Sequence, residues 1–265
     1  MFFLLMAVLT LVLFFIITSP LLIVLEIMRR THPVQVSKIA QPVVKVGFSM
    51  VLFFAGTKVI KLGLDNVPKD KPVMFAANHR GILDAALAYA SLPVLTGIVS
   101  KKELRKVPFL SWWMDLCSCY FLDRKDPRSG LKMILQSIDN INNGISMYIS
   151  PEGTRSKTRE MNPFKEGSFK ISTKSGCPIV PVAVSGADDI FENHKPFIKR
   201  ATAVIEYGEP IYPDKLSDEE LKFVGAYTRK IVGKMLEGHE KYLTKNYSRK
   251  QERKALAAQE KNIEK

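Results

Sequence analysis

A histidine and an aspartate five residues apart could form a general base together with the group that orients it. Residues 78–84, NHRGILD, follow an apolar run typical of a β-strand and precede a helical pattern. A neutral imidazole takes a proton from an alcohol through one ring nitrogen when a partner on the other nitrogen fixes its tautomer. Asp84 is spaced to be that partner of His79. A surface ion pair is the alternative interpretation of the same spacing.

Two further loops carry charged side chains after strand-like runs. One is the segment 101–128, which begins with Lys101 and Lys102 and has Arg124 after the strand-like run 120–122. The other is residues 150–156, SPEGTRS. Ammonium and guanidinium groups at the end of a strand can bind a phosphate. Solvated surface charge is the alternative for each of the lysines.

The loop 150–156 contains side chains suited to a ligand that has hydroxyl and phosphate groups. Gly153 permits a tight turn and the close approach of a ligand. The planar guanidinium of Arg155 matches phosphate oxygens, and the Glu152 carboxylate can accept hydrogen bonds from hydroxyls. A structural pair between Glu152 and Arg155 is the alternative, and it does not exclude binding.

From residue 72 onward, short apolar runs alternate with helical patterns, which predicts an α/β fold. The expected strands are 73–77, 95–100, 120–122, 145–149, 179–184 and 202–207. The expected helices are 83–92, 131–141, 165–175 and 216–243. We therefore expect a single mixed or parallel sheet flanked by helices. The three loops should meet at one edge of it, where ligand sites in such sheets lie.

The first 25 residues form an apolar segment without a charged side chain. A bilayer core about 30 Å thick needs roughly 20 helical residues, so the segment is long enough to span it. A cleaved signal peptide is the alternative, but no basic residue precedes the apolar run and no small-residue cleavage pattern follows it. Glu26, Arg29 and Arg30 come next, and the basic pair favours a cytoplasmic side for the downstream chain.

Residues 42–60 form a second apolar stretch, with Lys45 and Lys58 near its ends. Long lysine side chains can lie along an apolar face and place their amines at the headgroups, so an interfacial helix fits this composition. A second span, forming a hairpin with the first, is the alternative. If both segments crossed, the catalytic domain would lie on the same side as the N-terminus.

We expect three parts in the chain: membrane-associated N-terminal helices at 1–60, an α/β domain at 61–243 and a basic C-terminal tail at 244–265. The formal net charge of +13 favours anionic lipid or nucleic acid as a partner. Because the N-terminus is apolar, we expect a lipid membrane and no nucleic acid.

Two groups of side chains are expected to be structural. Cys117, Cys119 and Cys177 are expected as buried thiols, because the chain lacks the paired Cys or His clusters of zinc sites. The adjacent Trp112 and Trp113 are expected either in the core or at the level of lipid headgroups. No metal site is expected.

Four blocks follow one another along the chain: Asn78-His79 with Asp84, the basic segment 101–124, residues 152–155 and the apolar run 179–184. In order and spacing they resemble the glycerolipid acyltransferases of the PlsC type, over roughly residues 60 to 210. Among these, the chain is most similar to the lysophosphatidate acyltransferases. One departure lies at residues 107–111, VPFLS, where the family commonly has a glycine after a Val-Pro-Phe run.

The resemblance implies transfer of an acyl group from a thioester to the free hydroxyl of lysophosphatidate, giving phosphatidate in phospholipid synthesis. His79 would be the general base, oriented by Asp84. The substrate-binding residues would be Lys101, Arg124, Glu152, Gly153 and Arg155. The donor, acyl-CoA or acyl carrier protein, is a substrate, and no metal or cofactor is implied. The expected location is the inner or cytoplasmic membrane, with the catalytic domain facing the cytoplasm.

Three other functions agree with parts of the sequence. The same base could serve another lysophospholipid or a glycerol phosphate as acceptor. A lipid hydrolase would use water instead, but the chain lacks the Gly-x-Ser-x-Gly elbow of serine hydrolases. A basic, membrane-tethered binding module would account for the charge and leave the loops at His79 and Glu152 unexplained.

Overall fold

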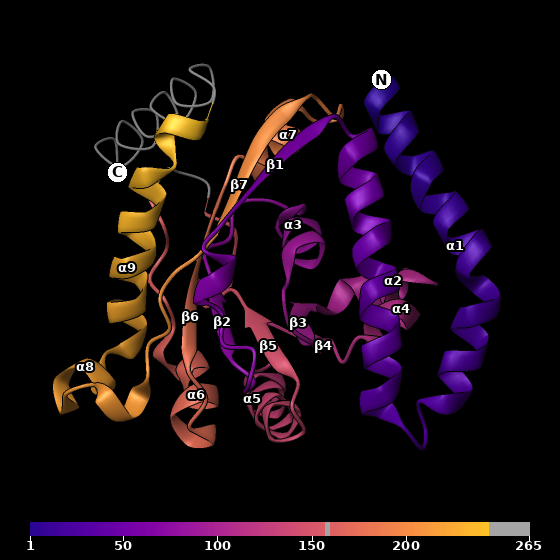
Figure 1. Ribbon diagram of the computed structural model, residues 1–265. Coiled ribbons are helices and arrows are strands. Elements are labelled where there is room, and N and C mark those ends of the chain that lie inside the picture. The colour runs from indigo at the N-terminus through magenta and orange to yellow at the C-terminus, as the bar shows by residue number, and fades with distance from the viewer. Residues whose placement is uncertain (157–159, 244–265) are drawn as a thin grey trace.

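The computed structural model of the chain describes residues 1–156 and 160–243. Within these ranges, seven strands form one sheet with helices on both faces (Figure 1). The strands are β1 (Thr57–Leu62), β2 (Met74–Ala77), β3 (Thr96–Lys101), β4 (Tyr120–Leu122), β5 (Ser146–Ile149), β6 (Ile179–Ser185) and β7 (Ala201–Tyr207). The helices are α1 (Phe2–Met28), α2 (Pro33–Phe54), α3 (Asp84–Ser91), α4 (Leu110–Leu116), α5 (Pro127–Asn142), α6 (Lys170–Ser175), α7 (Ala187–Ile190), α8 (Asp218–Lys222) and α9 (Val224–Gly238), with short 3-10 turns between some of them.

The sheet is mixed, which confirms the predicted fold class. Its strands lie in the order β1-β7-β6-β2-β5-β3-β4. The five strands from β6 to β4 run parallel, whereas β7 is antiparallel to β6 and β1 is parallel to β7. All six strands expected from the sequence are present, with bounds that differ by one residue at most. The carboxyl ends of the five parallel strands therefore share one edge.

Residues 57–62 form a strand rather than the end of the second apolar helix. The expectation of one stretch over 42–60 is wrong at both ends, because α2 begins at Pro33 and ends at Phe54. Gly56 adopts a left-handed conformation with φ of +72°, which most residues avoid, and the chain turns there into β1. The boundary that we expected at residue 60 lies inside this strand.

The side chains of β2 alternate between two apolar layers. Phe75 and Ala77 face the layer formed with α2, α3 and α4, whereas Met74 and Ala76 face the layer formed with α5, α6 and α9. All four side chains are fully buried. Burial on both faces explains why β2 reads as a continuous apolar run. It also places the loop after β2 in the middle of the sheet.

The helices α1 and α2 form an antiparallel hairpin beside the α/β domain (Figure 1). Both are long and apolar enough to cross a membrane, judged by length and composition. Pro20 lies inside α1 and lacks the N–H that would bond to the Ile16 carbonyl. The Ser19 hydroxyl donates to that carbonyl at 2.8 Å instead. Such a replacement keeps a helix continuous across a proline in an apolar environment.

Polar side chains join one face of α2 to the α/β domain. The Gln41 amide donates to the Val94 carbonyl at 2.8 Å and accepts from the Thr96 N–H at 2.6 Å. The Lys45 ammonium donates to the Leu92 carbonyl at 3.0 Å. The expectation that Lys45 reaches the lipid headgroups is therefore wrong, because the domain offers a partly buried carbonyl within its reach.

A buried histidine attaches the C-terminal helix α9 to the sheet. His239 Nδ1 lies 2.9 Å from the Ser185 hydroxyl, and Nε2 lies 2.9 Å from a Glu206 carboxylate oxygen. Since a carboxylate only accepts, we assign the ring proton to Nε2 and let Nδ1 accept from Ser185. Phe223 divides the expected helix 216–243 into α8 and α9. The expected basic tail, 244–265, lies outside the described residues.

We expect the free energy of unfolding to fall as the pH drops below about 6.5, in part because of His239. Burial lowers the pKa of this imidazole from its ordinary value of 6.5. Below that value the unfolded chain binds a proton that the folded chain excludes, so acid favours unfolding. Urea titrations above and below this pH measure the loss, which should be smaller in His239→Gln. An identical pH dependence in the two proteins would contradict the assignment.

Candidate active site

Three loops meet at the carboxyl edge of the sheet. They follow β2, β4 and β5, which run parallel. The loop after β2 contacts the loop after β5 through backbone hydrogen bonds of His79. The loop after β4 approaches the loop after β5 at Arg124 and Arg155, whose charges repel each other. The sheet therefore brings together segments that lie far apart in the sequence.

The carboxylate of Asp84 holds His79 from the first turn of α3. Asp84 Oδ2 lies 2.7 Å from His79 Nδ1 and accepts from the backbone N–H groups of Arg80 and Gly81 at 2.7 and 2.9 Å. Only 3% of Asp84 is exposed, so the interpretation as a surface ion pair is wrong. We assign the ring proton to Nδ1, because its carboxylate partner can only accept. His79 Nε2 keeps its lone pair and forms no hydrogen bond with another described residue.

The backbone of His79 is held by the loop after β5. The His79 N–H donates to Glu152 Oε1 at 2.7 Å, and the His79 carbonyl accepts from the Ser156 N–H at 2.9 Å. The second Glu152 oxygen accepts from the Asn162 N–H at 2.8 Å. Glu152 is 4% exposed, and burial raises the pKa of its carboxyl group. The structure thus gives Glu152 a part in holding His79 that the sequence did not predict.

Asn78 fixes the same loop on its other side. Its side-chain amide donates to the Val184 carbonyl at 2.9 Å and accepts from the Val184 N–H at 2.7 Å. Val184 belongs to β6, which neighbours β2. This pair of bonds continues the pairing of β2 with β6 beyond the end of β2. It therefore holds the first residue of the loop in place. The backbone at Asn78 and His79 is therefore held from both neighbouring strands, β5 and β6.

Gly153 and Arg155 shape the loop after β5. Gly153 has φ of +73°, a conformation that other residues adopt only with strain. A Cβ there would also displace the ammonium group of Lys165, which lies 2.8 Å away. Arg155 Nη1 lies 3.0 Å from Glu192 Oε1, an oxygen that also accepts from the Ile82 N–H at 2.6 Å. The alternative pair of Glu152 with Arg155 is not formed within the described residues, because Glu152 bonds to backbone amides instead.

The remaining predicted cations lie in the loops after β3 and β4. The Arg124 guanidinium has a pKa below its usual value because of partial burial and because Arg155 is close. Two cations held near each other are suited to an anion that both can share. Lys101 pairs with Glu103 at 3.3 Å, and its side chain is half exposed. An anion would have to compete with Glu103 for Lys101.

Two residues of the site could not be found by sequence reasoning. Glu192 enters from a 3-10 turn, 110 residues after Ile82, and carries no local motif. Tyr148 lies on β5 with a buried hydroxyl that has no hydrogen-bond partner among the described residues. Burial raises its pKa, and the nearby Asp84 carboxylate adds to the effect. Glu192 has no sequence neighbour that would indicate the site, and Tyr148 reads as one apolar position of the strand before the loop 150–156.

The cysteine and tryptophan side chains differ in how far they are buried. Cys117, Cys119 and Cys177 are all buried free thiols, as predicted. Trp113 is 2% exposed and belongs to the core, whereas Trp112 is 47% exposed. Trp113 is therefore a core residue, and Trp112 lies outside the core.

Known proteins are similar to this chain in sequence and in fold. The Acyltransferase family model matches residues 58–185. The 1-acyl-sn-glycerol-3-phosphate acyltransferase of Saccharomyces cerevisiae is 30% identical over 193 residues, which are 72% of this chain and 62% of the yeast protein. The protein of the same name from Borreliella burgdorferi is 28% identical over 70% of this chain and 74% of its own length.

A solved structure matches most of the chain. The crystal structure of PlsC, the 1-acyl-sn-glycerophosphate (LPA) acyltransferase from Thermotoga maritima, has a TM-score of 0.66 and 25% sequence identity. The match covers 87% of this chain and 95% of the Thermotoga chain. Fold and loops thus define an α/β domain of the acyltransferase type preceded by a helical hairpin. The chain belongs to the PlsC-type acyltransferase family. It spans less than two thirds of the yeast protein's length.

Proposed function

We propose that this chain transfers an acyl group from an acyl thioester to the free hydroxyl of lysophosphatidate and so forms phosphatidate. One observation carries the proposal most directly: His79 Nε2 is free of hydrogen bonds among the described residues, while Nδ1 is held by the buried Asp84. A base with one oriented, open nitrogen suits deprotonation of an alcohol. The names of the yeast and Borreliella relatives support lysophosphatidate as the acceptor.

In the proposed reaction, the acceptor oxygen attacks the thioester carbonyl carbon while His79 Nε2 takes the hydroxyl proton. The Asp84 carboxylate stabilises the imidazolium that forms. Collapse of the tetrahedral intermediate breaks the carbon–sulfur bond and forms the ester. The thiolate leaves readily because its conjugate acid has a pKa of about 8.5, and it takes up the proton held by His79. The step needs no covalent enzyme intermediate.

The acceptor phosphate is assigned to the cations at the same edge. Arg155 and Arg124 are the first candidates, because their charges already repel each other and an anion between them would relieve that repulsion. Lys101 assists from the end of β3. Gly153 keeps the loop backbone accessible, and Glu152 holds the loop and contributes to the acceptor site.

We place the enzyme at a membrane, where its lipid substrates reside. The apolar α1 suits contact with lipid, and Arg29 and Arg30 follow it on the side that we assign to the cytoplasm. The membrane is then the inner or cytoplasmic one, with the catalytic domain facing the cytoplasm. Acyl-CoA and acyl carrier protein are both donors to test.

The first experiment measures thiol release by the purified, detergent-solubilised protein given long-chain acyl-CoA, with and without lysophosphatidate, and identifies the lipid product by its mass. Release that requires the acceptor and yields phosphatidate is expected. Release without an acceptor would identify a thioesterase or hydrolase. If no thiol is released, acyl carrier protein donors and other lysophospholipids are tested next, because His79 could act as the base with those substrates as well.

Arg155→Ala is expected to raise the KM for lysophosphatidate about tenfold and to change kcat little, because a partly exposed charged hydrogen bond to the phosphate is lost. Initial rates at varied acceptor concentration separate the two constants. Lys174→Ala is the matched control, since it removes an exposed cation at the end of α6, before β6 begins and so at the opposite edge of the sheet. An unchanged KM in Arg155→Ala would remove Arg155 from the acceptor site.

A further inference from the structure

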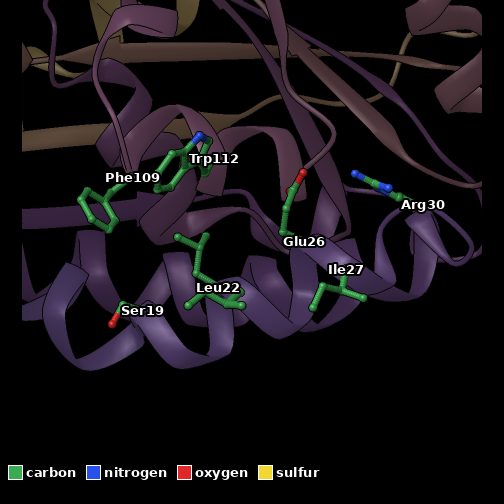
Figure 2. A pocket seen from close by; sticks show the side chains of 8 residues that line it. Ser19, Leu22, Glu26, Ile27, Arg30, Phe109 and Trp112 are labelled. Carbon is green, nitrogen blue, oxygen red and sulfur yellow. The ribbon is translucent and has the colours of Figure 1, made fainter.

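An apolar groove separates α1 from Phe109 and α4 (Figure 2). Leu22, Ile23 and Ile27 form the α1 side, and Phe109 and Trp112 form the other side. Its volume is about 610 Å³, within the range of about 300–1,000 Å³ found for small-molecule sites. No residue of the proposed chemistry lines it, so it requires a separate explanation.

Aromatic contacts define the side of the groove that faces α1. The Phe109 ring stacks on Phe15 of α1, with centroids 5.9 Å apart, and meets Trp112 edge-on at 5.1 Å. Phe109 has φ of +58°, a left-handed conformation that costs energy for a bulky residue. The loop thus holds an aromatic wall against α1 at a conformational cost, which is more common at ligand sites than in ordinary turns.

The groove opens onto an apolar surface of α1. Ile23 and Ile27 on its rim are 61% and 69% exposed. Their neighbours Ile16, Ile17 and Val24 are also exposed, so the groove continues into a face that suits lipid rather than water. An occupant that enters from this side is therefore an apolar chain.

One end of the groove carries an uncompensated positive charge. Figure 2 shows Glu26 and Arg30 at this end and Ser19 toward the other. Glu26 is neutralised by Arg29, which donates to its two oxygens at 3.0 and 2.6 Å. Arg30 forms no hydrogen bond or ion pair with another residue of the described ranges. A cation at the mouth of an apolar groove matches a lipid with an anionic headgroup.

We propose that this groove binds the acyl chain of a single-chain phosphate lipid, with the phosphate at Arg30. This inference rests on the proposed function: the ligand is the lysophosphatidate acceptor, taken from the bilayer before it moves to His79. A single apolar groove with one spare cation suits one chain and one phosphate. The groove thereby raises the local concentration of acceptor beside the catalytic domain.

Trp112 provides a direct readout, because Trp112 and Trp113 are the two tryptophans of the chain. In the full-length Trp113→Phe protein, reconstituted in phosphatidylcholine nanodiscs, Trp112 is the sole indole. Lysophosphatidate brominated on its acyl chain should quench this fluorescence saturably. Brominated lysophosphatidylcholine, whose headgroup has no net charge, should need at least a several-fold higher concentration. The Trp112→Phe protein, which retains the buried Trp113, should be quenched much less.

Arg30→Gln tests the headgroup contact. It should remove the preference for the phosphate lipid, and it should raise the KM for lysophosphatidate a few-fold at unchanged kcat. Lys38→Gln removes an exposed cation from α2 outside the groove and serves as the matched control. Quenching that is non-saturable, or equal for both headgroups, would overturn the inference and indicate ordinary lipid contact.

The quenching assay needs no turnover, so it separates the two proposals. Saturable, Arg30-dependent quenching without acyl transfer to lysophosphatidate would support the groove and refute the proposed reaction. Phosphatidate synthesis by a protein whose Trp112 is not quenched saturably would support the reaction and refute the groove.

Discussion

His79→Ala is expected to lower kcat for acyl transfer by about 10²–10⁴-fold, the range that a positioned general base contributes. The acceptor hydroxyl has a pKa far above neutrality, so it attacks a thioester slowly unless its proton is removed as the bond forms. In the structure, the imidazole is oriented by Asp84 and its backbone is held by Glu152, so its replacement removes the base and leaves both supports in place. Thiol release and phosphatidate formation measure the loss.

The control for this substitution is another histidine with no part in the site. His32 lies between α1 and α2, where its Nδ1 is 2.8 Å from the Thr31 hydroxyl, and His32→Ala should keep full activity. The His79→Ala protein should also keep its thermal unfolding profile and its association with membranes, because the side chain of His79 is not part of the apolar core. Wild-type turnover in His79→Ala would refute the mechanism.

Asp84→Asn is expected to lower kcat by about 10³–10⁴-fold, a loss that the wrong imidazole tautomer causes in serine–histidine–aspartate sites. Asp84 Oδ2 accepts from His79 Nδ1 and from the N–H groups of Arg80 and Gly81. In the asparagine variant, an amide oxygen in the place of Oδ2 would still accept from all three groups, but it carries no negative charge to stabilise the imidazolium. If the NH₂ group takes that place instead, Nδ1 must accept, and the proton moves to Nε2, which then cannot act as the base.

The measurement that distinguishes this effect from unfolding compares Asp84→Asn with Asp84→Ala. The alanine variant removes the acceptor for the two backbone N–H groups and should lose about 1–3 kcal/mol or more of stability, whereas the asparagine variant should lose less. Asp139→Asn, on the exposed side of α5, is the control, because it replaces a carboxylate by an amide away from the site. Activity of Asp84→Asn within tenfold of the wild type would mean that Asp84 does not orient the base.

The sheet and its loops could be predicted because their signals are local. A strand buried on both faces reads as a continuous apolar run, as in β2, β5 and β6, and parallel strands place their following loops at one edge. The His79 and Asp84 spacing is likewise a feature of one short turn at the start of a helix. β1 was missed because its run continues an apolar helix, and only its pairing with β7 identifies it as a strand.

The partners of the charged side chains could not be predicted, since these pairs join distant segments. Arg155 pairs with Glu192 and not with the nearby Glu152, because the Glu152 carboxylate accepts a hydrogen bond from the backbone N–H of His79. Lys45 bonds to a carbonyl of the domain instead of reaching lipid headgroups. Each of these outcomes depends on which acceptor the fold brings within about 3 Å, a distance that sequence separation does not reveal.

The amino-acid sequence was enough to predict the class of fold, the pairing of His79 with Asp84, the three charged loops and the apolar character of the N-terminus. These follow from periodicity, composition and short-range spacing, which act within one element or one turn. The three-dimensional fold was needed to show that Asp84 is buried, that Trp112 is exposed beside a groove while Trp113 is buried, and that Arg30 has no ion pair with another described residue. The physical reason is that burial and charge pairing depend on the neighbours of a side chain in space, and packing brings those neighbours from distant parts of the chain.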